Sequence, residues 1–125
     1  PEAKFDIFHG SWPYSSQLSA MAKNFKNVYI DMCWMHIISP SRAMSALDEW
    51  LDEVTVNKIM GFGGDFLCVE GSYGHAVIAR ENVTKVLAKK VDDGFYDIEE
   101  AKKYATWILR ENPLKLFFQK MDNSI

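Results

Sequence analysis

Hydrophobic and polar residues follow two spacings along this chain, and the spacings divide it into short strands and longer helices. Alternation with a period of two predicts strands, whereas apolar residues at every third or fourth position predict helices that bury one face. The alternating segments predicted as strands are residues 3–9, 28–33 and 58–64. The segments with helical spacing are residues 15–25, 40–54, 74–90, 97–109 and 113–118.

Local signals predict where several of these helices begin and end. Pro40 suits the first turn of a helix because its backbone angle is fixed and its missing N–H is not needed there. Asp97 followed by Glu100 matches a capping box. Residues 66–73 contain two glycines and are predicted as a loop. Pro113 is predicted to end one helix and to begin a short final one.

The order of the elements predicts an α/β fold with parallel strands. Strands alternating with helices of a dozen or more residues indicate βαβ units in a single domain spanning residues 1–125. In a parallel sheet His9, Cys33 and Asp65 lie at the same, C-terminal edge. Neighbouring strands are about 4.8 Å apart, so His9 and Asp65 start roughly 10 Å apart across the middle strand. Their side chains converge if the sheet curves into a barrel.

Composition narrows the classes of partner. The formal charge of −3 and the pI near 5.6 provide no basic field, so we expect no nucleic acid partner. The apolar runs are too short to span a bilayer, and we expect no membrane association. Cys33 and Cys68 lack a framework spacing, which favours a reduced, cytoplasmic protein. Because the chain begins with Pro1 next to strand-like sequence, we expect a piece of a longer polypeptide or the product of tag removal.

Asp65 is the first candidate for chemistry. It follows two glycines at the end of a predicted strand, and on strand alternation it shares its face with Gly61 and Gly63. That face is nearly bare of side chains, which leaves room for something that the carboxylate touches. The alternative is a simple turn in which Asp65 caps the following helix.

Four segments, in the correct order, resemble the amidohydrolase superfamily in its amidohydrolase-related branch. The family's sixth strand ends in His-Gly, its seventh and eighth strands follow, and its eighth ends in Asp; a helix–Asn–helix signature closes the chain. The matching segments are residues 5–10 (FDIFHG), 27–31 (NVYID), 59–65 (IMGFGGD) and 108–117 (ILRENPLKLF).

The resemblance implies a (β/α)8 (TIM) barrel of metal-dependent hydrolases with decarboxylase and isomerase relatives. This chain would supply three consecutive βα units, residues 1–92, and the C-terminal helices, residues 93–125. Asp65 would act as metal ligand or general base, and His9 would bind the metal or the substrate. The implied cofactor is a divalent metal ion, zinc foremost, and the implied partner is a small-molecule substrate.

The histidines of the family's first and fifth strands lie outside this chain. We therefore expect the intact enzyme to be active and this chain alone to have no turnover. The alternative is a small α/β structural or interaction domain without catalysis.

Four further residues are candidate substrate contacts, and each also has a structural explanation. Trp12 and Trp34 are predicted to line a substrate pocket, although core packing explains them equally well. His36 and Arg80 are predicted substrate contacts, with an ordinary loop histidine and an exposed pair with Glu70 as the alternatives.

Other polar residues are given structural roles. Both cysteines are read as buried small residues, and His75 as a polar residue at the start of its helix. Asp31 is expected to hydrogen-bond inside the barrel, because a buried acid needs a partner.

Self-association is expected from the sheet edges. Both outer strands are predicted to have unpaired edges, which are templates for pairing with another chain. Phe5, Ile7 and Tyr29 are expected on the face that would look into a closed barrel. We therefore expect the chain to associate with copies of itself or with the remainder of a barrel.

Overall fold

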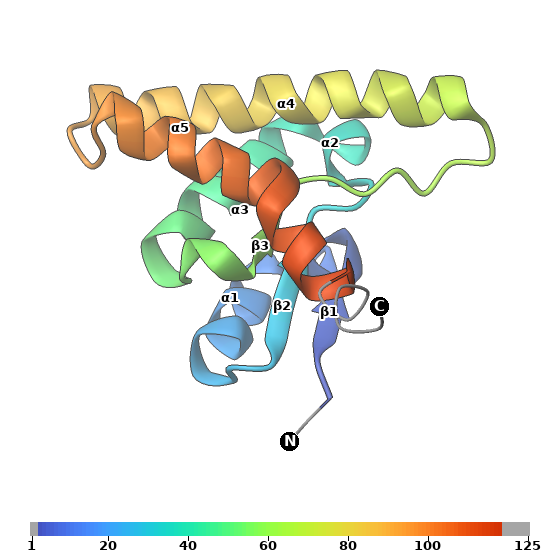
Figure 1. Cartoon of the computed structure of the whole chain (residues 1–125), viewed down its shortest axis with the longest axis horizontal. Helices are drawn as coiled ribbons and strands as arrows, with labels where there is room; N and C mark the ends of the chain where they lie inside the picture. Colours follow the sequence, from blue (N-terminus) through green and yellow to red (C-terminus); the bar gives the residue numbers. More distant parts are fainter. Residues whose placement is uncertain (1–2, 119–125) are drawn as a thin grey trace, which may run out of the picture.

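The fold contains a parallel sheet of three strands, and the structure, a computed structural model, describes residues 3–118 of the chain. The strands are β1 (Phe5–Ile7), β2 (Val28–Asp31) and β3 (Ile59–Met60), in the order β1-β2-β3 (Figure 1). In the register, Ile7 lies beside Ile30, and Ile30 beside Ile59. The prediction of an α/β fold with parallel strands is confirmed.

All three strands are shorter than predicted: β2 ends at Asp31 instead of residue 33, and β1 and β3 end early for different reasons. β1 ends at Ile7 because Phe8–Ser11 forms a 3₁₀ turn (η1) in which His9 and Gly10 have positive φ. β3 ends at Met60 because regular ladder pairing with β2 ends there. Beyond Met60 the chain stays extended but irregular until α4.

The helices follow the predicted order with two differences. Pro40 occupies the first turn of α3 and Asp97 forms the capping box with Glu100, both as predicted. A short helix, α2, replaces the expected loop after β2, and α4 begins at Val69, so the loop predicted up to residue 73 was wrong. The helices are α1 (Ser15–Asn24), α2 (Met35–Ile38), α3 (Pro40–Glu53), α4 (Val69–Asp92) and α5 (Ile98–Thr106), with a 3₁₀ turn η2 (Val56–Lys58) before β3.

The C-terminal helical segment continues past the predicted break. α5 runs into the π-helical segments η3 (Trp107–Glu111) and η4 (Leu114–Phe118), and Pro113 lies between them without interrupting the helix. In η3 the Asn112 N–H donates to the Trp107 carbonyl, five residues back. The same spacing would pair the Ile108 carbonyl with Pro113, which has no N–H, so this carbonyl is left for another donor.

That free carbonyl closes the outer edge of β3. The Gly61 N–H donates to the Ile108 carbonyl at 2.9 Å. The side-chain amide of Asn112 donates to the carbonyls of Val56 at 2.7 Å and Ile59 at 2.8 Å. The prediction that both outer strands have open edges was therefore wrong for β3.

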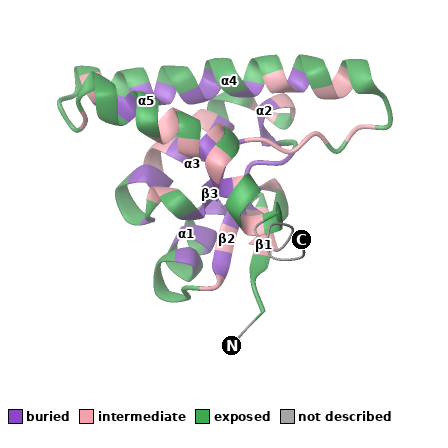
Figure 2. Cartoon of the chain, viewed as in Figure 1, coloured by how far each residue is buried: buried purple, intermediate pink, exposed green. Residues whose placement is uncertain are grey.

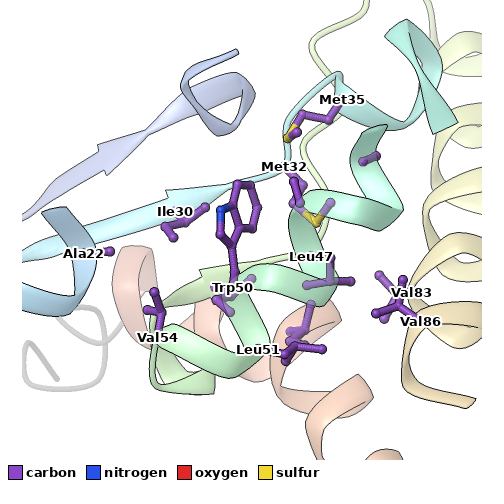
Figure 3. Packing of buried hydrophobic residues seen from close by; sticks show 14 of the residues in the cluster. Ala22, Ile30, Met32, Met35, Leu47, Trp50, Leu51, Val54, Val83 and Val86 are labelled. Atoms are coloured by element: carbon purple, nitrogen blue, oxygen red, sulfur yellow. The ribbon is translucent and has the colours of Figure 1, made fainter. Parts of the chain in front are cut away.

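The hydrophobic core lies between the sheet and α1, α3 and α4. Trp50 of α3 is fully buried at its centre, and its indole N–H donates to the Ser15 carbonyl of α1 (Figure 3). The helices bury the sides that face this core, whereas the outer surfaces of α4 and α5 are exposed (Figure 2). None of the helices in the described part of the chain is both long and apolar enough to cross a membrane.

The two faces of the sheet differ in chemistry. Ile7 and Ile30 face the helical core, and the neighbouring positions Asp6, Tyr29 and Asp31 lie on the opposite face. The expected orientation of β1 was therefore inverted, because Ile7 packs against the core rather than toward a barrel interior. The acid in the middle of this strand decides its orientation, since it can stay away from the apolar helices only in this way.

Candidate metal centre

Three potential metal ligands converge at the C-terminal edge of the sheet. One ring nitrogen of His9, the Sγ of Cys33 and a carboxylate oxygen of Asp65 all lie within 4.8 Å of one another. The three residues follow β1, β2 and β3 respectively, so each strand contributes one donor. Their common edge was predicted from the strand order, and the structure brings them closer than the spacing across a flat sheet.

His9 is held in one orientation. Its Nδ1 lies 3.0 Å from the Cys33 carbonyl, which can only accept, so Nδ1 carries the proton and Nε2 keeps a free lone pair. A histidine that donates one ring N–H to a backbone carbonyl while its other nitrogen binds a metal is the usual arrangement in metal sites. The turn η1 aims the ring, because His9 itself has a φ of 59°.

Cys33 is the buried member of the cluster. Its backbone N–H donates to the Asp31 carboxylate at 2.7 Å, which confirms that Asp31 is hydrogen-bonded. A Cβ on Gly63 would lie 2.7 Å from the Cys33 Cβ and 2.8 Å from its Sγ, so only glycine permits this approach. Burial, followed by the carboxylates of Asp31, Asp65 and Asp6, raises the pKa of the thiol to about 12. A metal ion would have to displace this proton.

Asp65 is the exposed member, and its backbone is strained. It has a φ of 45°, and Trp34, next to Cys33, has a φ of 63°. Non-glycine residues with positive φ are costly and cluster at functional sites. Together with His9, this strain lies at or beside all three members of the cluster.

A pair of carboxyl groups lies next to the cluster on the same side of the sheet. Burial raises the pKa of Asp6 to about 6, and burial together with the charge of Asp6 raises the pKa of Asp31 to about 7. Both carboxylate oxygens of Asp6 are buried, and the carboxyl group of Asp31 is the neighbour with which Asp6 can share a proton. The neighbourhood of the Cys33 thiol is therefore rich in acidic groups, and none of the ion pairs within residues 3–118 involves Asp6 or Asp31.

His36 and His75 lie in the interior instead of at the surface. His36 is fully buried, and its ring nitrogens lie 2.9 Å from the Gly61 carbonyl and 3.2 Å from the Asn82 amide. His75 is also buried, although it was expected to be a polar residue at a helix start. That expectation was wrong because α4 begins earlier, at Val69, which places His75 inside the helix.

The remaining predicted contacts lie at the surface. Trp12 is 42% exposed and Trp34 is 38% exposed, so neither is a core residue. The guanidinium of Arg42 stacks 5.2 Å from the Trp12 ring centre, a partner that the sequence pattern did not indicate. Arg80 is exposed on α4.

Both cysteines had been read as buried small residues. That reading holds for Cys33, but Cys68 is exposed, because it lies just before α4, outside the core.

Comparison with known proteins gives one curated relative and one structural neighbour. Protein fluG of Emericella nidulans is 28% identical over 118 residues, which cover 94% of this chain and 14% of fluG. A crystal structure from Lactobacillus casei, described as that of a candidate metal-dependent hydrolase, has a TM-score of 0.74 and 22% identity. It matches 98% of this chain, which covers 31% of that protein. No protein-family model matches the chain.

These comparisons establish a shared fold with a segment of a larger protein. The chain spans 14% of the length of the curated relative and 31% of the length of the structural neighbour.

Proposed function

We propose that this chain forms the C-terminal part of a metal-dependent hydrolase of the amidohydrolase type and contributes His9, Cys33 and Asp65 to its metal centre. The observation that carries the proposal is the convergence of three donors from three consecutive strand ends. The resemblance of the strand motifs, which predicted His9 and Asp65 from sequence, supports it independently. The proposal extends the predicted pair by Cys33.

The donor set fits a divalent metal such as zinc. Zinc accepts histidine nitrogen, cysteine sulfur and carboxylate oxygen, and catalytic sites combine three protein ligands with an open position. The raised pKa values of the neighbouring acids Asp6 and Asp31 indicate that burial and their mutual repulsion disfavour negative charge there, which a nearby cation would compensate. The donor set and the neighbouring acids all lie within residues 3–118.

The residues at this edge of the sheet would have different roles in metal-dependent hydrolysis. A bound divalent ion lowers the pKa of water and polarises an acyl oxygen. His9 offers a ring nitrogen, with the ring held by the bond from Nδ1 to the Cys33 carbonyl, and Cys33 offers a buried thiol. The exposed carboxylate of Asp65 can bind the metal or accept a proton from water, since a general base must reach the proton that it takes. Trp12 and Trp34 flank this edge as candidate contacts to a small-molecule substrate.

The rest of the enzyme would come from other parts of a (β/α)8 barrel. The relatives are several times longer than this chain, and the family's other histidine ligands are expected upstream. We therefore expect the 125-residue chain to bind zinc weakly and to have no turnover.

Calorimetric zinc titration of the chain at neutral pH tests the metal centre. Cys33→Ser and Asp65→Ala should each weaken binding at least about tenfold, because each removes one of three donors. Cys68→Ser and Asp93→Ala are matched controls, since both residues are exposed and lie outside the cluster. Equal affinity of wild type and both cluster variants would refute the assignment.

In the intact protein, Asp65→Asn tests the chemistry. The amide keeps the size of the side chain but cannot accept the proton. A wild-type rate in this variant would exclude the general-base role of Asp65.

A further inference from the structure

The segment that carries Asp65 leaves the sheet before it reaches the metal centre. We call residues 61–65 the Asp65 arm; it begins where β3 ends at Met60 and contains three glycines. Among the described residues, two backbone hydrogen bonds reach this arm, one at Gly61 and one from the Trp34 N–H to the Gly63 carbonyl at 3.4 Å. A glycine-rich segment with so few backbone bonds needs other contacts to stay in place.

A histidine side chain supplies one of these contacts. His36, from α2, lies 2.9 Å from the Gly61 carbonyl through Nε2 and is fully buried. Because a carbonyl only accepts, Nε2 carries the proton. Its Nδ1 lies 3.2 Å from the Asn82 side-chain amide of α4, so Nδ1 accepts from Asn82. The amide therefore selects the tautomer that can hold the arm.

A second histidine packs against the arm from α4. His75 is buried, and its ring centre lies 5.2 Å from that of Phe62 and 5.9 Å from that of Phe66. The two phenylalanines bracket the last three residues of the arm. The rings of His75 and His36 are themselves 5.8 Å apart, so the contacts form one continuous cluster.

We propose that His36, with its tautomer set by Asn82, is a positioning residue for the metal centre. It acts on the Asp65 arm, which joins α2, α4 and the third ligand. The inference rests on the proposed function, because His36 would position a ligand of the proposed metal centre and zinc affinity is one of the two readouts. The residue touches neither metal nor substrate in this assignment, since both of its ring nitrogens already have partners.

The competing interpretation is that His36 only stabilises the core. The two differ in what a substitution changes: a purely structural residue lowers the unfolding midpoint and leaves the affinity of the folded chain for zinc unchanged. A positioning residue lowers the affinity beyond what the stability loss explains. Loss of such an outer partner commonly weakens metal affinity 10- to 100-fold.

The test compares three variants by zinc calorimetry under conditions in which each is folded. His36→Leu removes the donor and should weaken zinc binding about tenfold. His36→Gln can still donate from its terminal amide and should remain within about threefold of wild type. Val86→Ala is the destabilising control, because Val86 is buried in α4 but makes no hydrogen bond to the arm through its side chain.

A second readout does not depend on the metal. In the zinc-free chain, amide hydrogen exchange of residues 62–65 should be at least about tenfold faster in His36→Leu than in Val86→Ala. Equal exchange in the two variants would overturn the positioning role, and so would equal zinc affinities of His36→Leu and Val86→Ala if Cys33→Ser does weaken zinc binding. Unchanged zinc affinity in Cys33→Ser would refute the metal centre alone, and the exchange comparison would then still decide whether His36 holds the arm.

Discussion

Replacing Asn112 by Ala should open the outer edge of β3. The side-chain amide of Asn112 is buried and donates to two carbonyls, those of Val56 at 2.7 Å and Ile59 at 2.8 Å. Alanine removes both bonds without supplying a donor. Water cannot easily replace it at Ile59, which is fully buried.

The expected loss follows from the hydrogen bonds. Each bond contributes about 1 kcal/mol net, and a buried carbonyl left without a donor costs about 1–3 kcal/mol. With one carbonyl fully buried and the other partly exposed, Asn112→Ala should lower the free energy of unfolding by about 2–4 kcal/mol. Asn112→Asp should lose at least as much at neutral pH, because a carboxylate cannot donate and would face two carbonyl oxygens.

Urea unfolding followed by tryptophan fluorescence measures this loss, because buried Trp50 becomes exposed on unfolding. Asn24→Ala is the matched control. The amide of Asn24 donates to the Ala20 carbonyl at 2.7 Å on an exposed helix surface, so its removal should change stability by less than about 0.5 kcal/mol. A loss below about 1 kcal/mol for Asn112→Ala, or one equal to that of the control, would contradict the closure of the β3 edge.

Three further predictions concern the metal centre and its support. Gly63→Ala should weaken zinc binding at least about tenfold in calorimetry, because its Cβ would lie 2.8 Å from the Cys33 Sγ. Gly74→Ala is the control, because a Cβ there meets open space and should leave zinc binding unchanged. Equal zinc affinities of the two variants would contradict a close contact between Gly63 and Cys33. Burial lowers the pKa of His36 from 6.5 to about 4. The contribution of neutral His36 to the free energy of unfolding is therefore fully present above pH 6.5 and is lost as the pH falls through about 4. In urea titrations the wild type should therefore lose about 3 kcal/mol more than His36→Gln between pH 7 and pH 3.5, and parallel pH profiles would refute this. Excess zinc should raise the thermal midpoint and EDTA should reverse the change; an unaltered midpoint at saturating zinc would count against binding to the folded state.

Spacing and capping were sufficient to predict most of the fold. The parallel order of the strands follows from the alternation of strands with helices, and Pro40 and Asp97 begin their helices where local chemistry places them. The start of α4 was missed because Gly71 and Gly74 argue against a helix. The structure tolerates both; Phe66 packs so close to Gly71 that a Cβ there would lie 2.7 Å from its ring.

The C-terminal helix shows why propensity alone was insufficient. Pro113 normally ends a helix because it lacks an N–H. Here the unpaired carbonyl of Ile108 finds its donor in Gly61, which is distant in sequence. The π-helical spacing and the bond from Gly61 together make up for the N–H that Pro113 lacks. Neither can be recognised from the residues around Pro113 alone.

Part of the candidate site could be predicted and part could not. The strand order alone places His9, Cys33 and Asp65 at one edge, but Cys33 was not identified as a donor because its spacing matches no cysteine motif. Its role depends on Gly63, which lets the arm approach the thiol. The buried position of His36 depends on α2, a single helical turn too short to give a periodic signal.

The closure of β3 also has a consequence for the order in which the chain can fold during synthesis. All three strands, and the helices between them, emerge before the segment that completes the sheet. Asn112 follows Ile59 by 53 residues and Val56 by 56 residues. A nascent chain that stops short of Asn112 carries a complete ladder with the outer edge of β3 unsatisfied, the kind of surface that chaperones and other nascent strands recognise. The helical segment that carries Asn112 can therefore stabilise the β3 edge only after both partners of its amide have been synthesised.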